Sequence, residues 1–175
     1  AEKKIYALRK GERGESLEHI GTTLHKVFDR LTELSQSDSM IPGLSTGLRD
    51  LDTKINGLNK SDLLLIAARP AMGKSSLAMN IAQHVAIRQE KTVAVFNLEM
   101  SAPQIGNRII WSEAHIDGEK IRSGNLNGDD WPQIARVIGK VSRSPLYIDD
   151  TPGITVAEIR AKCRKLSLEH GLSLI

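Results

Sequence analysis

Hydrophobic positions change their spacing along the chain near residue 40. Before this point they recur every seven residues in two interleaved series, Leu17, Leu24, Leu31 and Ile20, Val27, Leu34. This heptad spacing predicts an amphipathic helix with a narrow apolar stripe, which is the pattern of a helix that lies in a groove. After Ile41, short apolar runs alternate with helical patterns, which predicts an α/β domain.

The predicted helix over 17–34 has two alternative roles. It could pack on its own domain or dock on a neighbouring copy of the chain, and the heptad alone favours the first. The serine-rich segment 35–39 that follows predicts a flexible joint. We therefore divide the sequence into a linker with an amphipathic helix, 1–40, and a larger domain, 41–175.

Four short apolar runs in the larger domain are candidate strands, namely Leu63–Ala67, Thr92–Leu98, Leu146–Asp149 and Leu172–Ile175. Helical patterns separate these runs along the chain. Short apolar strands that alternate with helices form parallel sheets that are covered on both faces. The predicted fold class is therefore α/β, with a parallel sheet flanked by helices.

Polar residues mark where two of the intervening helices begin. Ser101 and Gln104 have the spacing of a capping box. Thr155 and Glu158 form a second one, and Gly171 is expected to end that helix. Two further short helices are expected, over 116–124 and 131–141.

Composition narrows the class of protein without deciding it. A net charge of +3 is too small to indicate a polyanionic partner by itself. A single cysteine, Cys163, excludes an internal disulfide and a zinc site built on paired cysteines, and it fits a reducing, cytoplasmic compartment. The sequence has no apolar run typical of a signal peptide or a membrane span. With two each of Trp, Tyr and Phe, it also lacks an aromatic platform for single-stranded nucleic acid.

The segment from Ala68 to Ser75 carries the clearest chemical signal, because it lies between an apolar run and a helical pattern. A loop that closes on Gly-Lys-Ser directs backbone N–H groups at phosphates, brings a lysine to the β- and γ-phosphates and offers a hydroxyl to Mg²⁺. Ala68 stands where the general pattern has glycine, so the alternative is a turn with a solvated lysine. The helical pattern after the loop favours phosphate binding, since helix N-termini attract anions. The candidate nucleotide-binding residues are Arg69, Pro70, Ala71, Met72, Gly73, Lys74, Ser75 and Ser76.

Glu99 is the candidate catalytic base, because it directly follows the uncharged run 93–98 at the end of the next predicted strand. A carboxylate at this edge of a parallel sheet can orient and deprotonate the water that attacks a phosphate. Lys74 is the second candidate catalytic residue, and Ser75 is the candidate Mg²⁺ ligand. The alternative for Glu99 is an ordinary strand-end glutamate exposed to solvent.

Other polar residues are interpreted as structural. Asp149 and Asp150 follow another apolar run, but such a pair more often caps the turn after it, here 151–153. The five histidines have no metal-like spacing, and we expect them at the surface.

Several motifs together resemble DnaB-type replicative DNA helicases over essentially the whole chain. They are Ala67–Ser75, Asn97–Met100, Ile121–Gly124, Tyr147–Thr151 and the upstream segment Pro42–Leu48 with Leu51 and Asp52. Alanine in place of the first loop glycine is usual in this family. The resemblance implies a RecA-like P-loop ATPase core, a ring hexamer and ATP-driven 5′-to-3′ translocation on single-stranded DNA at the replication fork.

The resemblance also assigns roles to residues. Lys74 and Ser75 match the phosphate and Mg²⁺ contacts of the family, and Glu99 matches its water-activating glutamate. The helix over 17–34 matches a linker helix that packs on the adjacent subunit, which reverses the preference stated above. In the family, primase and a helicase loader are partners of the whole protein.

The resemblance further implies that parts of the ATPase lie beyond Ile175. These are the acidic residue that supports Mg²⁺, the DNA-binding loops, the glutamine sensor and the arginine finger. We therefore expect a helicase fragment that carries the N-terminal part of the ATPase domain, and that binds nucleotide weakly and hydrolyses little by itself. The alternatives are an interaction module that acts through the helix over 17–34, and a RecA-type recombinase.

Overall fold

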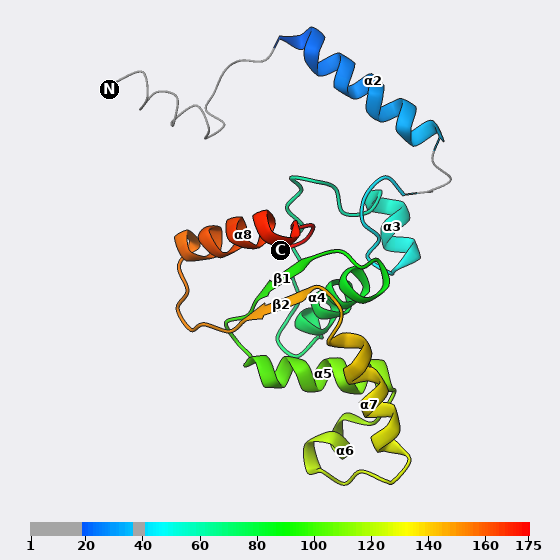
Figure 1. Ribbon diagram of the computed structural model, residues 1–175, viewed down its shortest axis with the longest axis vertical. Coiled ribbons are helices and arrows are strands. Elements are labelled where there is room, and N and C mark those ends of the chain that lie inside the picture. The colour runs from blue at the N-terminus through cyan, green and yellow to red at the C-terminus, as the bar shows by residue number, and fades with distance from the viewer. Residues whose placement is uncertain (1–18, 37–40) are drawn as a thin grey trace. The chain divides into compact units, whose positions relative to one another are not determined.

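The computed structural model describes residues 19–36 and 41–175 of the chain (Figure 1). The chain divides into two compact units, 1–42 and 43–175. Each unit is described by itself below.

The first unit contains one described helix, α2 (Ile20–Gln36). This helix confirms the predicted amphipathic segment, although Leu17 lies outside the described residues. Its apolar stripe is exposed, at Ile20, Leu24, Val27, Phe28 and Leu31. The predicted joint begins too early, because Ser35 and Gln36 belong to the helix, and 37–39 lie outside the described residues.

A parallel sheet forms the centre of the second unit. Strand β1 (Val93–Phe96) pairs with β2 (Leu146–Asp149) in parallel, with Val93 opposite Leu146 and Phe96 opposite Asp149. On its other edge, β1 forms a single parallel bridge from Val93 to Leu174. The predicted parallel pairing is confirmed for these segments, and the predicted strand 172–175 is reduced to that bridge.

The predicted strand Leu63–Ala67 is wrong, since the described part of the chain gives this run no strand pairing. Leu63 and Leu65 are 85% and 81% exposed, and only Ile66 packs against the core. The apolar pattern is that of a buried strand, but a strand also needs a hydrogen-bonded neighbour. Among the described residues no strand is paired with this run.

Helices cover both faces of the sheet, as the sequence predicted (Figure 1). Alternate β1 side chains point to opposite faces. Val93 packs in a buried cluster with Ile81 and Val85 of the segment after the phosphate loop. On the other face, α8 (Val156–His170) leaves a cavity of about 260 Å³ lined by residues that include Ala94, Tyr147 and Cys163.

Four further helices agree with the sequence in position, within a few residues. They are α4 (Lys74–Gln83), α5 (Ala102–Ala114), α6 (Gly118–Ser123) and α7 (Asp130–Val141). The short helix α3 (Arg49–Ile55) was not predicted. Both capping boxes are present: Ser101 N donates to Gln104 Oε1 (3.0 Å), and Thr155 N donates to Glu158 Oε2 (2.8 Å). The continuation of α4 as a π-helical turn, η1 (His84–Arg88), was not predicted either.

A buried acid organises the segment before the phosphate loop. Asp52 is 2% exposed, and it accepts hydrogen bonds from Ser45 Oγ (2.6 Å), Thr46 N (2.8 Å) and Thr46 Oγ1 (2.7 Å). Burial alone would raise the pKa of Asp52, but these hydrogen bonds together hold it below its ordinary value. The carboxylate is therefore charged and satisfied, as buried charges must be.

Candidate nucleotide-binding site

The phosphate loop is a tight turn that leads directly into α4. Ala71 and Gly73 both have positive φ, 63° and 84°, and Met72 N donates to Arg69 O (3.2 Å) across the turn. A Cβ added to Gly73 would have no other atom within 4 Å. Glycine is therefore required here by the positive φ of the backbone and not by a lack of space for a side chain. The loop is exposed at every residue from Arg69 to Lys74.

The start of α4 has the properties of an anion site. The N-cap residue, Gly73, supplies no side-chain cap. The first helical hydrogen bond runs from Leu77 N to Gly73 O (2.9 Å), so the N–H groups of Lys74, Ser75 and Ser76 precede the helical ladder. Such N–H groups, together with the positive end of the helix dipole, suit a phosphate. The residues present therefore fit a nucleotide phosphate.

Lys74, at the start of α4, and Glu99, in the segment after β1, lie side by side. Lys74 Nζ lies 3.8 Å from Glu99 Oε1, and the two side chains are 48% and 69% exposed. Both charges face solvent, so a phosphate could approach the lysine while the carboxylate stays within reach of a water molecule. This pair gives the site a cation for phosphate and a candidate base in one place.

Asn97 shapes the loop that carries Glu99. Its Oδ1 accepts hydrogen bonds from Glu99 N (2.9 Å) and Met100 N (3.1 Å). From the sequence, Asn97 was recognised only as part of a motif, without a role of its own. The available signal was an asparagine placed two residues before the acid, where its side chain can bond the backbone N–H two residues on.

The two serines at the start of α4 have different surroundings. Ser75, the predicted Mg²⁺ ligand, is half-buried, and Ser76 is exposed. The Ser76 Oγ accepts a hydrogen bond from Arg108 Nη1 (2.9 Å) on α5. Arg108 is therefore a neighbour of the candidate site that sequence reasoning missed, because the contact depends on how α4 packs on α5.

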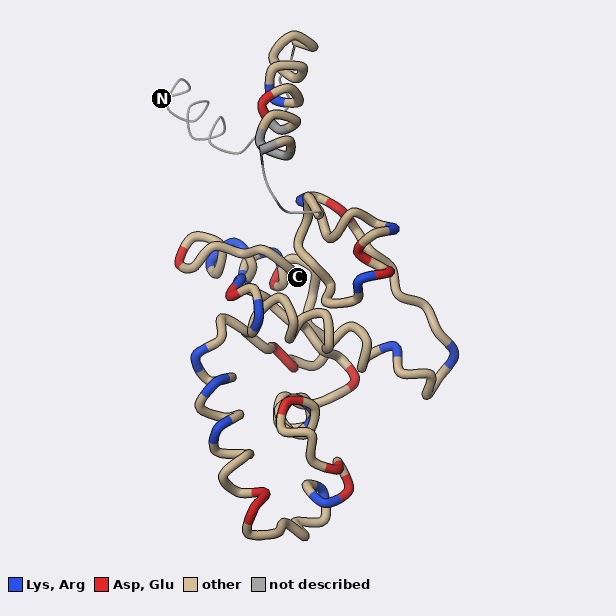
Figure 2. Tube along the Cα trace, turned by 90° about the vertical axis from the view of Figure 1, so that its right-hand side faces the viewer, with Lys and Arg blue, Asp and Glu red and all other residues tan. Residues whose placement is uncertain are grey.

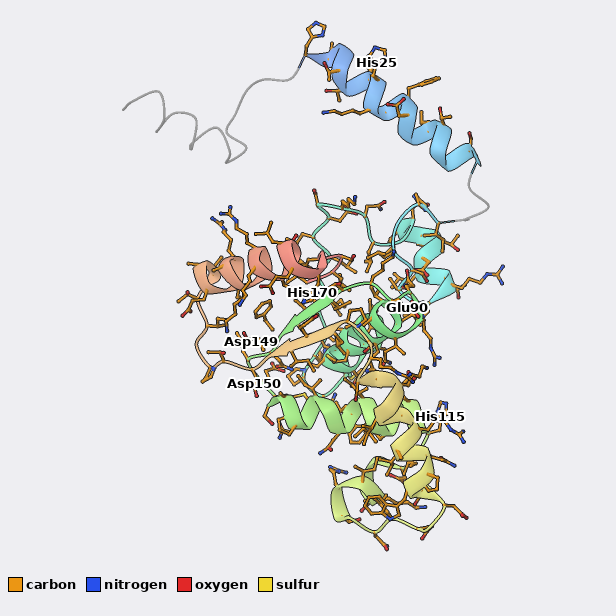
Figure 3. All side chains as sticks on the ribbon, in the orientation of Figure 1. His25, Glu90, His115, Asp149, Asp150 and His170 are labelled. Atoms are coloured by element: carbon orange, nitrogen blue, oxygen red, sulfur yellow. The ribbon has the colours of Figure 1, made fainter. Side chains whose placement is uncertain are left out.

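Asp149 and Asp150 lie at the carboxyl end of β2 (Figure 3). Asp149 forms an ion pair with Lys162 and accepts a hydrogen bond from Thr151 N (3.0 Å). The hydrogen bond from Lys162, followed by those from Thr151, lowers the pKa of Asp149 to about 2. Asp150 Oδ2 accepts from Ala102 N (2.7 Å) at the start of α5. The expectation that these acids cap the turn 151–153 is confirmed for Asp149. It is wrong for Asp150, which caps the start of α5 instead.

The histidines are exposed, as expected, with one exception. His84 is half-buried, and a Cβ on Gly47 would lie 2.7 Å from its ring. The expectation of a surface position is wrong for His84, because the glycine lets the backbone of 43–48 close over the ring. His170, labelled in Figure 3, stacks on Tyr147 with ring centroids 5.7 Å apart.

Three broader features bear on function. Acidic and basic positions are interspersed along the described trace (Figure 2), in agreement with the small net charge. None of the described helices is both long enough and apolar enough to cross a membrane. The described residues also contain no cluster of three or more His, Cys, Asp or Glu side chains that could hold a metal ion.

The fold is that of a RecA-like ATPase domain, and comparison with known proteins identifies the family. Residues 43–175 match the DnaB-like helicase C-terminal domain, and the chain belongs to this family. The replicative DNA helicase DnaC of Bacillus subtilis (strain 168) is 41% identical over 175 residues, which cover 100% of this chain and 38% of that protein.

Solved structures agree with this family. One, described as an ATPase domain, has a TM-score of 0.82 at 28% identity and covers 91% of this chain and 56% of its own. Another, a DnaB-like replicative helicase studied for its interactions with primase, has a TM-score of 0.76 at 26% identity, over 98% of this chain and 41% of its own. The resemblance stated from the motifs is thereby confirmed. The chain spans 38% of the length of its Bacillus relative.

Proposed function

We propose that the chain is the nucleotide-binding part of a replicative DNA helicase. The observation that supports this function most directly is the ion pair of Lys74 with Glu99. Lys74 lies at the start of α4, which has no side-chain cap, and its Nζ is 3.8 Å from Oε1 of Glu99 in the segment after β1. In this proposal the residues Arg69–Ser76 hold the phosphates of ATP, and Ser75 offers its hydroxyl to Mg²⁺. Bound Mg²⁺ would supply charge neutralisation at the phosphates.

Hydrolysis then depends on residues in two segments, the start of α4 and the loop after β1. Lys74 binds the β- and γ-phosphates, and its release from Glu99 frees the carboxylate to orient and deprotonate the attacking water. Asn97 keeps the Glu99 backbone in place through its two hydrogen bonds. Hydrolysis drives 5′-to-3′ translocation on single-stranded DNA, which is bound by parts of the protein outside residues 1–175.

The proposed assembly is a ring hexamer in which α2 packs on a neighbouring subunit. The exposed apolar stripe of α2 supports this role, because an amphipathic helix in water needs a partner for its apolar face. The similarity to a helicase solved for its interactions with primase supports primase as a partner, and a helicase loader is proposed with it. The motor would work in the cytoplasm, with the DNA.

The test of this function uses the complete gene product. We expect ATP hydrolysis stimulated by single-stranded DNA, and unwinding of a forked duplex with a 5′ tail. Lys74→Ala should abolish both, since the phosphates lose their cation. The control is Lys60→Ala, which removes an exposed lysine outside the loop and should leave both activities unchanged. Hydrolysis and unwinding that survive Lys74→Ala would contradict the proposal.

The assembly has its own test by light scattering on the gel-filtered gene product. Leu24→Asp combined with Leu31→Asp places charges on the apolar stripe, and we expect it to dissociate the ring. Thr22→Asp adds a charge on the opposite face of α2 and should leave the ring intact. An intact ring in the double variant would exclude the proposed role of α2 in assembly. The recombinase alternative finds no support, because the relatives reported above are replicative helicases.

A further inference from the structure

Arg108 lies on the face of α5 that packs against α4. The apolar part of this contact is a buried cluster of Met79 from α4 with Ile105 and Ile109 from α5. Ser76 lies one helical turn before Met79, and Arg108 lies one turn after Ile105. The hydrogen bond from Arg108 Nη1 to Ser76 Oγ (2.9 Å) therefore extends the apolar contact to the first turn of α4, where Lys74 begins the helix.

The guanidinium of Arg108 is itself supported by an aromatic ring. Its Cζ lies 5.9 Å from the centroid of the Trp111 ring, within the range of a cation–π contact. The Trp111 ring in turn lies against Gly118, since a Cβ there would be 2.5 Å from the ring. The contacts thus run from α6 through Trp111 and Arg108 to Ser76, and they restrict the positions that the guanidinium can take.

The start of α5 is fixed separately, and this matters for Glu99. Ala102 N, at the first residue of α5, donates to Asp150 Oδ2 (2.7 Å) at the end of β2. Glu99 lies only three residues before Ala102, so α5 and the loop that carries Glu99 are attached to one another. The position of α5 relative to α4 therefore influences the separation of Glu99 from Lys74.

We propose that Arg108 is a positioning residue for ATP hydrolysis. It holds the first turn of α4 against α5 through Ser76 and so keeps Lys74 and Glu99 at the separation that hydrolysis requires. Arg108 does not contact the reacting atoms in this account, and it acts through Ser76. This inference rests on the nucleotide-hydrolysing function proposed above.

The test compares steady-state ATP hydrolysis and nucleotide affinity in variants of the complete gene product. Arg108→Met removes the donor but keeps an unbranched apolar stem. Because a displacement of about 1 Å in an active site can cost up to about 100-fold in rate, we expect kcat to fall about tenfold. KM and the Kd of a fluorescent ATP analogue should stay within about twofold, since the N–H groups and Lys74 that bind phosphate remain.

Two variants separate positioning from general stability. Arg108→Lys keeps a donor for Ser76 and should recover kcat to within about threefold of the unmodified protein. Arg88→Met removes another guanidinium that joins the same two helical segments, through Glu113 on α5 (3.3 Å), but away from the phosphate loop. It should leave kcat within about twofold of the unmodified value.

A double-mutant cycle tests whether Arg108 acts through Ser76. In a Ser76→Ala background, Arg108→Met should change kcat by less than about twofold, because the interaction is already absent. A full tenfold loss in that background would overturn the proposal. So would an unchanged kcat in Arg108→Met, or equal effects of Arg108→Met and Arg88→Met accompanied by equal losses of melting temperature. Absence of hydrolysis in the unmodified protein would instead contradict the proposed function itself.

Discussion

Each of the two parallel strands carries an acidic side chain at or just after its carboxyl end, and the surroundings of these two acids differ sharply. Glu99, after β1, is 69% exposed, and its ion-pair partner Lys74 lies 3.8 Å away. Asp149, the last residue of β2, is 19% exposed, and it is held by Lys162 and by the backbone of Thr151. Asp149 is already satisfied within the fold, whereas Glu99 is held loosely enough to exchange its partner for a ligand.

This difference separates structural from functional acids at one edge of a sheet. Asp52 extends the comparison to full burial, with three hydrogen bonds to one carboxylate. The more completely a carboxylate is satisfied by the fold, the more its loss should affect stability. The more exposed it is beside an anion site, the more its loss should affect turnover.

The largest expected effect is on hydrolysis at Glu99. Glu99→Gln removes the proposed base while keeping the shape of the side chain, so kcat for ATP should fall by about 100-fold or more. Nucleotide affinity should stay within about threefold, because the phosphate contacts remain. Asp149→Asn is the matched change on the neighbouring strand and should leave kcat within about threefold. Equal losses of kcat in the two variants would remove the distinction between these acids.

The next effect is on stability at Asp52. Asp52→Asn places an amide N–H₂ group where hydroxyl donors now point, and we expect the free energy of unfolding to fall by about 1–3 kcal/mol. Urea denaturation followed by circular dichroism measures it. Asp62→Asn, at an exposed position, should change the free energy of unfolding by less than about 0.5 kcal/mol. A similarly small change at Asp52 would show that its hydrogen bonds do not stabilise the fold.

The smallest effect is the acid dependence of stability at Asp149. Its pKa is about 2 in the folded chain against an ordinary value of 3.8, so the folded state favours the charged carboxylate. The resulting stabilisation is fully present above the ordinary pKa and is lost as pH falls from about 4 to about 2. Asp149→Asn should therefore make the dependence of the melting temperature on pH less steep over this interval. An unchanged slope would mean that the pair with Lys162 does not stabilise the fold.

Local sequence patterns predicted the elements that are determined by residues close together in the sequence. Strand β2 was predicted with its observed bounds, because its apolar run is enclosed by Pro145 and Asp150. The two capping boxes were predicted for the same reason, since their residues are three positions apart in the sequence. The helical pattern after the phosphate loop and the place of Glu99 after the run 93–98 predicted that Lys74 and Glu99 lie at one edge of the sheet, although the strand expected before the loop is absent from the described residues.

Features that depend on distant neighbours were not predicted. The run 63–67 has the composition of a strand, but whether it pairs depends on a neighbour that the run itself does not specify. Arg108 is one of many arginines in the sequence, and only the packing of α5 on α4 brings it to Ser76. The half-buried position of His84 likewise depends on the close approach of Gly47, which is far away in the sequence.

The most direct test of the account is a nucleotide titration of residues 1–175 with a fluorescent ATP analogue and Mg²⁺. We expect weak, saturable binding, since the start of α4 offers free N–H groups and Lys74 supplies a cation. Lys74→Ala should weaken this binding by about tenfold or more, because the loss of a charge-assisted contact to phosphate removes about 1.5–3 kcal/mol. Equal affinities of the unmodified chain and Lys74→Ala would contradict the assignment of the loop as a phosphate site.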